Sequence, residues 1–186
     1  MKRAVAAVMI VCLLSGCNAA DDSLAQAMEL RSQILNGEKC TFQAVVTADY
    51  GNALYTFQME YEADGAGNLS FTVTDPETIR GITGHISQDG AGLTFDDKVL
   101  AFPLLADGQL TPVSAPWLFL NSIRSGYLSG TGRTDDGNCI YIDDSFGERP
   151  IRTEIFTDEN NLPYRADIIW QDRRVLSVDI QNFSIQ

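Results

Sequence analysis

The chain has 186 residues, 45% of them hydrophobic and 20% charged, and its 25 acidic and 13 basic residues give a formal net charge of −12. This length allows one domain with a sizeable core and is short for two. The acidic excess argues against a nucleic-acid-binding protein and against electrostatic binding to anionic lipid, because both need clustered Lys and Arg.

The first seventeen residues are typical of an export signal that ends at a cysteine. Lys2 and Arg3 form the positive start, and residues 4–14 carry no charge. This apolar run is too short for a permanent membrane span. The run closes on Leu-Ser-Gly-Cys, which resembles the bacterial lipobox, where the thiol receives a diacylglyceryl group before cleavage. We therefore predict lipidation at Cys17, and the alternative is a plain secretory signal with an incidental cysteine.

Acyl chains on Cys17 would place the mature protein outside the cytoplasm, on the outer face of the cell membrane or on an outer membrane if the host has one. Each buried methylene contributes about 0.8 kcal/mol, and two chains anchor stably. Removal of the signal peptide, residues 1–16, takes Lys2 and Arg3 away and lowers the net charge to −14. Residues 17–23 are predicted to form a lipidated polar tether, and residues 24–186 a single domain.

The tether leads into one predicted helix and then into short strands. Ser23 is suited to the N-cap, residues 24–36 carry a broad apolar face, and Gly37 is a natural stop, which together predict a helix over 23–36. Alternating apolar and polar residues then predict a hairpin of two strands and a third strand after a Gly-rich turn. These strands cover 40–49, 54–63, and a segment that carries Leu69, Phe71 and Val73.

The second half of the chain repeats this pattern around one apolar helix. Residues 103–116 show no periodicity and are long for a connection, so they form either a functional flap or a plain excursion. The segment 117–123 is apolar around most of its circumference, which predicts a helix against the interior. The other predicted elements are a helical turn at 76–81 and strands at 82–88, 93–96, 99–102, 128–133, 138–143, 151–157, 162–171 and 174–185.

About eleven strands and two helices indicate an α+β fold that is mainly antiparallel β. Most strands alternate between apolar and polar residues, so one face of the sheet is expected to be covered and the other wet. A sheet of this length must curl, and helices laid across the concave face bury its apolar side chains. We predict a curled, unclosed β-barrel with helices across its concave face.

The order of these elements resembles the LolA/LolB-like lipoprotein carriers and their lipid-anchored relatives, including GerS-like germination lipoproteins. The most specific segment is 156–168, Phe-Thr-Asp-Glu-Asn-Asn-Leu-Pro-Tyr-Arg-Ala-Asp-Ile, which is similar to the family's strand, polar turn, Leu-Pro and strand. The resemblance implies an unclosed barrel with a helical lid that holds acyl chains. It also implies, for the GerS-like relatives, a partner among cell-wall enzymes.

Two cysteines remain in the exported domain, and their pairing is left open by the sequence. Cys40 and Cys139 could form a disulfide outside the cytoplasm, which would close a loop of about 100 residues and stabilise the fold by up to about 4.7 kcal/mol. Alternatively, each is a small buried hydrophobic side chain in a strand. Sequence does not establish whether their Cβ atoms meet.

Catalytic and metal-binding motifs are not found in the sequence. His85 is the only histidine, so neither a His-based metal site nor a Cys-His dyad is expected, and no Gly-x-Ser-x-Gly elbow presents a serine. The doublets at 96–97, 135–136 and 143–144 are adjacent in strands or turns, which points their carboxylates to opposite faces. We expect a non-enzymatic protein without a cofactor.

Two functions are favoured for such a domain over a third, an envelope hydrolase, for which the sequence offers no pair of nucleophile and base. The first is binding of a lipid or acyl chain in a dry groove between sheet and helices, and the second is a protein-binding adaptor or regulator of an envelope enzyme, with a solid core. The groove would be lined by Phe42, Tyr55, Phe57, Met59, Phe71, Phe95, Trp117, Phe119 and Trp170.

Overall fold

The computed structural model describes residues 18–87, 90–95, 98–102, 110–135, 137–144 and 150–186, leaving aside the side chains of 18–21, 90, 91, 93–95 and 98–102. Along these residues the elements are α2 (Asn18–Asn36), β1 (Lys39–Asp49), β2 (Leu54–Asp64), β3 (Leu69–Asp75), the short 3-10 helix η1 (Glu77–Ile79), β4 (Thr83–Ser87), β5 (Gly90–Phe95), β6 (Lys98–Phe102), α3 (Ala115–Ser125), β7 (Tyr127–Thr134), β8 (Gly137–Asp143), β9 (Ile151–Thr157), β10 (Pro163–Trp170) and β11 (Arg173–Ile185).

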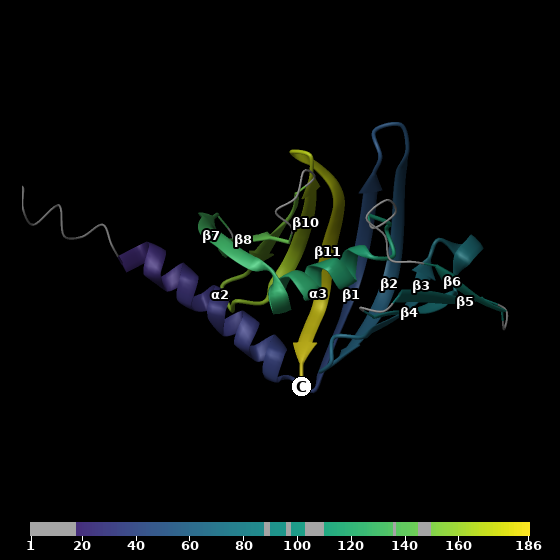
Figure 1. Cartoon of the computed structure of the whole chain (residues 1–186), viewed down its shortest axis with the longest axis horizontal. Helices are drawn as coiled ribbons and strands as arrows, with labels where there is room; N and C mark the ends of the chain where they lie inside the picture. Colours follow the sequence, from purple (N-terminus) through teal and green to yellow (C-terminus); the bar gives the residue numbers. More distant parts are fainter. Residues whose placement is uncertain (1–17, 88–89, 96–97, 103–109, 136, 145–149) are drawn as a thin grey trace, which may run out of the picture.

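These strands form one antiparallel sheet in the order β6-β5-β4-β3-β2-β1-β11-β10-β9-β8-β7. Every neighbouring pair is consecutive in the sequence except β1 and β11, so two meanders are joined where the first strand pairs with the last. The edge strands β6 and β7 are not neighbours, and the sheet curls without closing (Figure 1). The predicted α+β fold, an unclosed antiparallel barrel crossed by helices, is confirmed.

The helix α3 lies across the inner face of the sheet and packs against β1, β8, β9, β10 and β11 (Figure 1). Its buried side chains include Phe119, Leu120 and Ile123. Proline is suited to the first turn of a helix, where its missing N–H is not needed. The helix therefore begins at Ala115, two residues before the predicted start, and includes Pro116 in its first turn.

The helix α2 lies beside β7 and against the end of α3. Ala27, Leu30 and Ile34 are its buried apolar residues. The predicted start at Ser23 is wrong, because the helix begins at Asn18 and residues 18–22 are helical. Alanines at 19 and 20 favour helix, and acidic residues near a helix N-terminus interact favourably with its dipole. Cys17 and the predicted signal peptide lie outside the described residues, and no described helix is long and apolar enough to cross a membrane.

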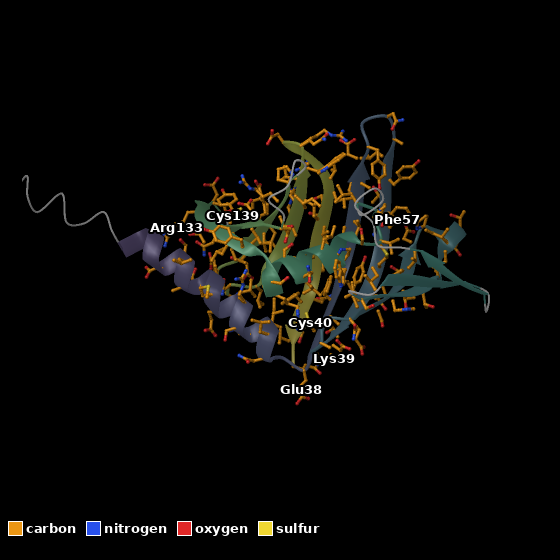
Figure 2. The ribbon with its side chains drawn as sticks, viewed as in Figure 1. Glu38, Lys39, Cys40, Phe57, Arg133 and Cys139 are labelled. Carbon is orange, nitrogen blue, oxygen red and sulfur yellow. The ribbon has the colours of Figure 1, made fainter. Side chains whose placement is uncertain are left out.

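Cys40 and Cys139 are free in the structure, so the disulfide that the sequence left open is not formed. Three strands, β11, β10 and β9, separate β1 from β8 in the sheet. At about 4.8 Å per strand, β1 and β8 are about 19 Å apart along the sheet, whereas a disulfide needs Cα atoms within about 7 Å. Figure 2 shows the two cysteines in separate parts of the molecule. Both thiols are buried, which raises the pKa of Cys40 to about 12 and that of Cys139 to about 11.

The outer face of the sheet is less wet than the alternation predicts. Asp167 is expected on the solvent side of β10, but it is 5% exposed. Arg165 holds it through Nε and Nη2, both at 3.0 Å, and Arg174 adds an ion pair at 3.3 Å. The Ser177 hydroxyl donates a fourth hydrogen bond at 2.7 Å. These four bonds satisfy a carboxylate that would otherwise be costly to bury.

Candidate functional site

The inner row of β2 passes from buried to exposed along the groove between the sheet and α3. Met59 and Tyr61 are 1% and 3% exposed. The same row continues through Phe57, which is half-buried, to Tyr55, which is 48% exposed. The sequence alternation is the same at both ends, so the difference arises from what covers the strand. We call the end at the β2–β3 turn the closed end, and the end at the β1–β2 tip the open end.

At the closed end the inner side chains fill the space beneath α3. Phe119 is fully buried, and its ring meets those of Phe42 and Phe183 edge-on, with centroids 6.0 and 6.2 Å apart. Phe42 also stacks on Tyr61 at 4.9 Å. The opening that the described residues leave beside Leu120, between the helices and β1–β2, is about 10 Å³. Such a space admits about one water molecule and no acyl chain.

Two arginines at the closed end donate hydrogen bonds to backbone carbonyls of neighbouring elements. Arg31 of α2 donates from Nε to the Ile123 carbonyl (2.6 Å) and from Nη2 to the Gly126 carbonyl (2.7 Å). Arg124 of α3 donates from Nη2 to the Gly65 carbonyl in the β2–β3 turn (2.7 Å). The Ile123 carbonyl is one of those that a helix C-terminus leaves without a partner inside the helix. The arginines thus tie α2, α3 and the turn together.

The open end exposes apolar side chains around the β1–β2 tip. Tyr50, Leu54 and Tyr55 are 40%, 67% and 48% exposed. The Tyr50 hydroxyl donates to the Leu110 carbonyl at 2.8 Å, which brings the segment before α3 to this tip. Phe57 lies on this part of β2, well away from Lys39 and Cys40 at the other end of β1 (Figure 2). The open end is therefore an exposed apolar tip, with Tyr55 on the inner row of β2 and Leu54 on its outer row.

The predicted ligand-lining residues separate into two groups in the structure. Four of them are buried in the closed end and pack against each other: Phe42, Met59, Phe71 and Phe119. Tyr55 is largely exposed, and three more are half-buried against the core: Phe57, Trp117 and Trp170. The side chain of Phe95 lies outside the described residues. Sequence reasoning misses Tyr50, because residues 50–52 have only the pattern of a turn, and Leu54, because it lies on the row of the predicted strand opposite Tyr55.

A polar trough of about 800 Å³ lies on the opposite, outer face of β1 to β4. It is wide open to solvent. Phe42, Tyr61 and Phe71 are among its lining residues, but most of the lining carries hydroxyl, amide and carboxylate groups, so it does not suit an acyl chain. His85 lies on this face above Gly92, where an added Cβ would approach the imidazole to 2.5 Å. The polar side chains are those of Thr41, Gln43, Glu60, Glu62, Ser70, Thr72, Thr83, His85 and Asn182.

A buried hydroxyl and carboxylate cluster links α3 to the sheet. Asp144, after β8, accepts hydrogen bonds from the Ser122 and Thr153 hydroxyls, both at 2.7 Å. Burial raises the pKa of Asp144 above its usual range, and these two hydrogen bonds oppose that rise. The described residues bring no histidine or further nucleophile to this cluster, and they contain no group of three or more His, Cys, Asp or Glu residues that could hold a metal. The cluster fits a structural role.

No protein-family model matches the chain, and no curated protein matches its sequence. Solved structures that match include an uncharacterised conserved protein of Thermus thermophilus (TM-score 0.49, 13% identity, 87% of each chain covered). A LolA superfamily protein of Nitrosomonas europaea matches with TM-score 0.46 and 11% identity over 86% of this chain and 93% of that one. The lipoprotein LppX of Mycobacterium tuberculosis matches with TM-score 0.39 and 13% identity over 86% and 94%.

A LolA superfamily protein and a lipoprotein are thus among the solved structures that match this chain. The likeness is one of fold at low sequence identity. It assigns no ligand, partner or activity to this chain, so the functional argument depends on the geometry of the two ends of the groove.

Proposed function

We propose that this chain is a non-enzymatic, extracytoplasmic lipoprotein, anchored through Cys17, that binds a hydrophobic ligand such as an acyl chain at the open end of its groove. The observation that carries the proposal is the exposure of the inner aromatic row of β2 at Phe57 and Tyr55. Ligand sites are concave, mostly apolar and largely preformed. The filled closed end makes the open end the place where such a ligand fits.

The aromatic side chains and the fixed position of the tip at the open end support an apolar ligand. Tyr50 and Tyr55 lie with their ring centroids 6.0 Å apart, and tyrosines present a large apolar face with a polar tip. Two hairpin tips meet here, because Arg173 of the β10–β11 hairpin donates to the Asp49 carbonyl at 3.1 Å. The hydrogen bond holds the β1–β2 tip in place, which is the preorganisation that a binding site needs.

The proposal is tested by titrating the full chain with a fluorescent fatty acid, cis-parinaric acid. A Cys17→Ser background keeps the protein's own acyl chains from competing. Phe57→Ser and Tyr55→Ser should each weaken probe binding, by about tenfold for Phe57→Ser, because each removes apolar contact area.

Tyr127→Ser is the matched control, since Tyr127 is a 61% exposed tyrosine on β7, outside the groove. Its variant should bind the probe as the parent does. Absence of saturable binding by the parent, or an equal loss in the Tyr127 variant, would show that the open end is not a lipid site.

A second function is favoured by the filled core beneath α3, namely an adaptor that docks an envelope protein on the same apolar tip. Exposed tyrosines are frequent among the residues that dominate protein interfaces. A photo-crosslinking residue at Leu54 should then capture one stoichiometric partner in the envelope, and the same residue at Glu29 of α2 should not. Capture at both positions, or at neither, would count against the adaptor.

A further inference from the structure

The helix α2 carries two apolar stripes, and the protein covers only one of them. Ala27, Leu30 and Ile34 are buried against the rest of the domain. A second stripe, Leu24, Met28 and Leu35, is 45%, 50% and 46% exposed. At 100° per residue these three side chains lie within about 40° of each other and about 110° from the buried stripe. We call them the outer stripe.

Two charged residues lie beside the outer stripe on the helical wheel: Asp21, in the first turn of α2, and Arg31, which is turned toward the rest of the domain. Arg31 lies next to Leu24 on the helical wheel, and its guanidinium reaches across to the Ile123 and Gly126 carbonyls at 2.6 and 2.7 Å. Its donors are therefore engaged by the end of α3. The acidic residues Asp22 and Glu29 lie about 130° from the stripe. Apart from Asp21 in its first turn, the helix thus has an apolar side and an acidic side, each facing a different direction.

The position of α2 in the chain indicates what covers this stripe. The helix begins at Asn18, directly after Cys17, so an acyl group on Cys17 would be attached at its first turn without a spacer. The stripe starts about 10 Å from that point and extends for about 16 Å, at 1.5 Å per residue. A second copy of the chain is a poor fit, because three half-exposed side chains fall far short of the roughly 800 Å² per partner that a stable interface buries.

We propose that the outer stripe of α2 lies in the interface of the bilayer, so that the helix rests flat on the membrane and forms the second part of the anchor. The inference rests on the proposed lipidation of Cys17. Interfacial helices bury an apolar face by 5 to 10 Å and keep the charged face in water, and one acyl chain alone binds only marginally. The acidic side of α2 favours neutral over anionic lipid. The β1–β2 tip lies at the opposite end of β1 from the junction with α2 (Figure 1).

The proposal is tested with the full lipidated chain in phosphatidylcholine vesicles that contain a spin-labelled quencher lipid near the headgroup. Single cysteines at 24, 28 and 35 carry an environment-sensitive fluorophore, and Asp22→Cys, Glu29→Cys and Gln33→Cys are the matched controls on the other side of α2. The buried native thiols Cys40 and Cys139 should not be labelled. The outer-stripe positions should lose about twofold more emission to the quencher than the controls, as expected for a helix that lies in the interface.

Equal quenching on both sides, or none on either, would overturn the proposal. Energy transfer between labelled copies, without quenching by lipid, would overturn it in favour of self-association. Failure of the wild-type chain to float with vesicles would overturn it together with the predicted anchor. The fatty-acid titration uses Cys17→Ser protein without vesicles, so its outcome stands apart from all of these.

Discussion

The closed and open ends of the groove are built on the same two strands, and they differ in what covers those strands. At the closed end, α3 lays Phe119 on Phe42, and Arg31 and Arg124 tie the helices to each other and to the β2–β3 turn. At the open end, the same alternation leaves Tyr55 largely exposed. The comparison shows that an aromatic row on the inner face of a curled sheet becomes core where the crossing helix covers it. Where the helix does not reach, the same row stays exposed and can serve as a binding surface.

The largest effect is expected from Phe119→Ala at the closed end. Phe119 is fully buried, and its removal leaves a cavity between two rings. The free energy of unfolding should fall by about 3–5 kcal/mol. Urea denaturation followed by circular dichroism measures this. A loss below about 1 kcal/mol would mean that the closed end is not packed as described.

The next largest effect is expected from Arg31→Met, which keeps the aliphatic stem but removes the two hydrogen bonds to the end of α3. Hydrogen bonds from charged groups contribute more than neutral ones, so the free energy of unfolding should fall by about 2 kcal/mol. Arg133→Met is the control, since Arg133 is exposed on β7. Similar losses for both variants would contradict the role of Arg31 in fastening the closed end.

A smaller effect is expected from Tyr55→Ala at the open end. The side chain is 48% exposed and makes one tilted ring contact, with Tyr50. Its removal should lower the free energy of unfolding by at most about 1 kcal/mol. Calorimetry on parent and variant checks this, and a loss as large as that of Phe119→Ala would remove the distinction between the two ends.

The smallest effect is a pH dependence at Asp144, near the closed end. Burial raises its pKa in the folded state above the usual value of an aspartate. A raised pKa gives a stabilisation that is full below the unfolded pKa and is lost as the pH rises through the folded pKa. Asp144→Asn does not titrate. The stability of the parent relative to this variant should therefore decline as the pH rises above about 4, the usual pKa of an aspartate, and a flat or rising difference in denaturation midpoints would contradict the assignment.

Much of the fold could be predicted from local patterns. The alternation of Tyr55, Phe57, Met59 and Tyr61 indicates the correct inner face of β2, and the turn at 50–52 predicts the hairpin with β1. The pairing of β1 with β11 could not be read from such patterns, because it joins residues far apart in the sequence. The helix start is predicted at Ser23 because serine is a good N-cap. Ser23 instead lies within α2, and its hydroxyl is 2.8 Å from that of Thr131.

The candidate site could be predicted by residue type but not by burial. Phe42 and Phe57 both belong to inner rows, and the sequence does not distinguish them. Their difference depends on Phe119 and Phe183, which come from distant segments and cover only Phe42. Asp167 lies on the outer face as predicted. Its burial depends on ion pairs with Arg165 and Arg174, and Arg174 reaches it only because of the register in which β10 and β11 pair.

The joint between β1 and β11 has a consequence for biogenesis. The two meanders are each built from local hairpins, but they meet only through Lys39–Asp49 and the final strand, Arg173–Ile185. Pairings between such distant segments form slowly, because a long loop must be closed first. The two halves of the sheet therefore stay unjoined until the 13 residues of β11 are available. Deletion of that strand should leave a protease-sensitive chain. Under the export proposed above, this late assembly would leave the sheet unjoined while the polypeptide crosses the membrane.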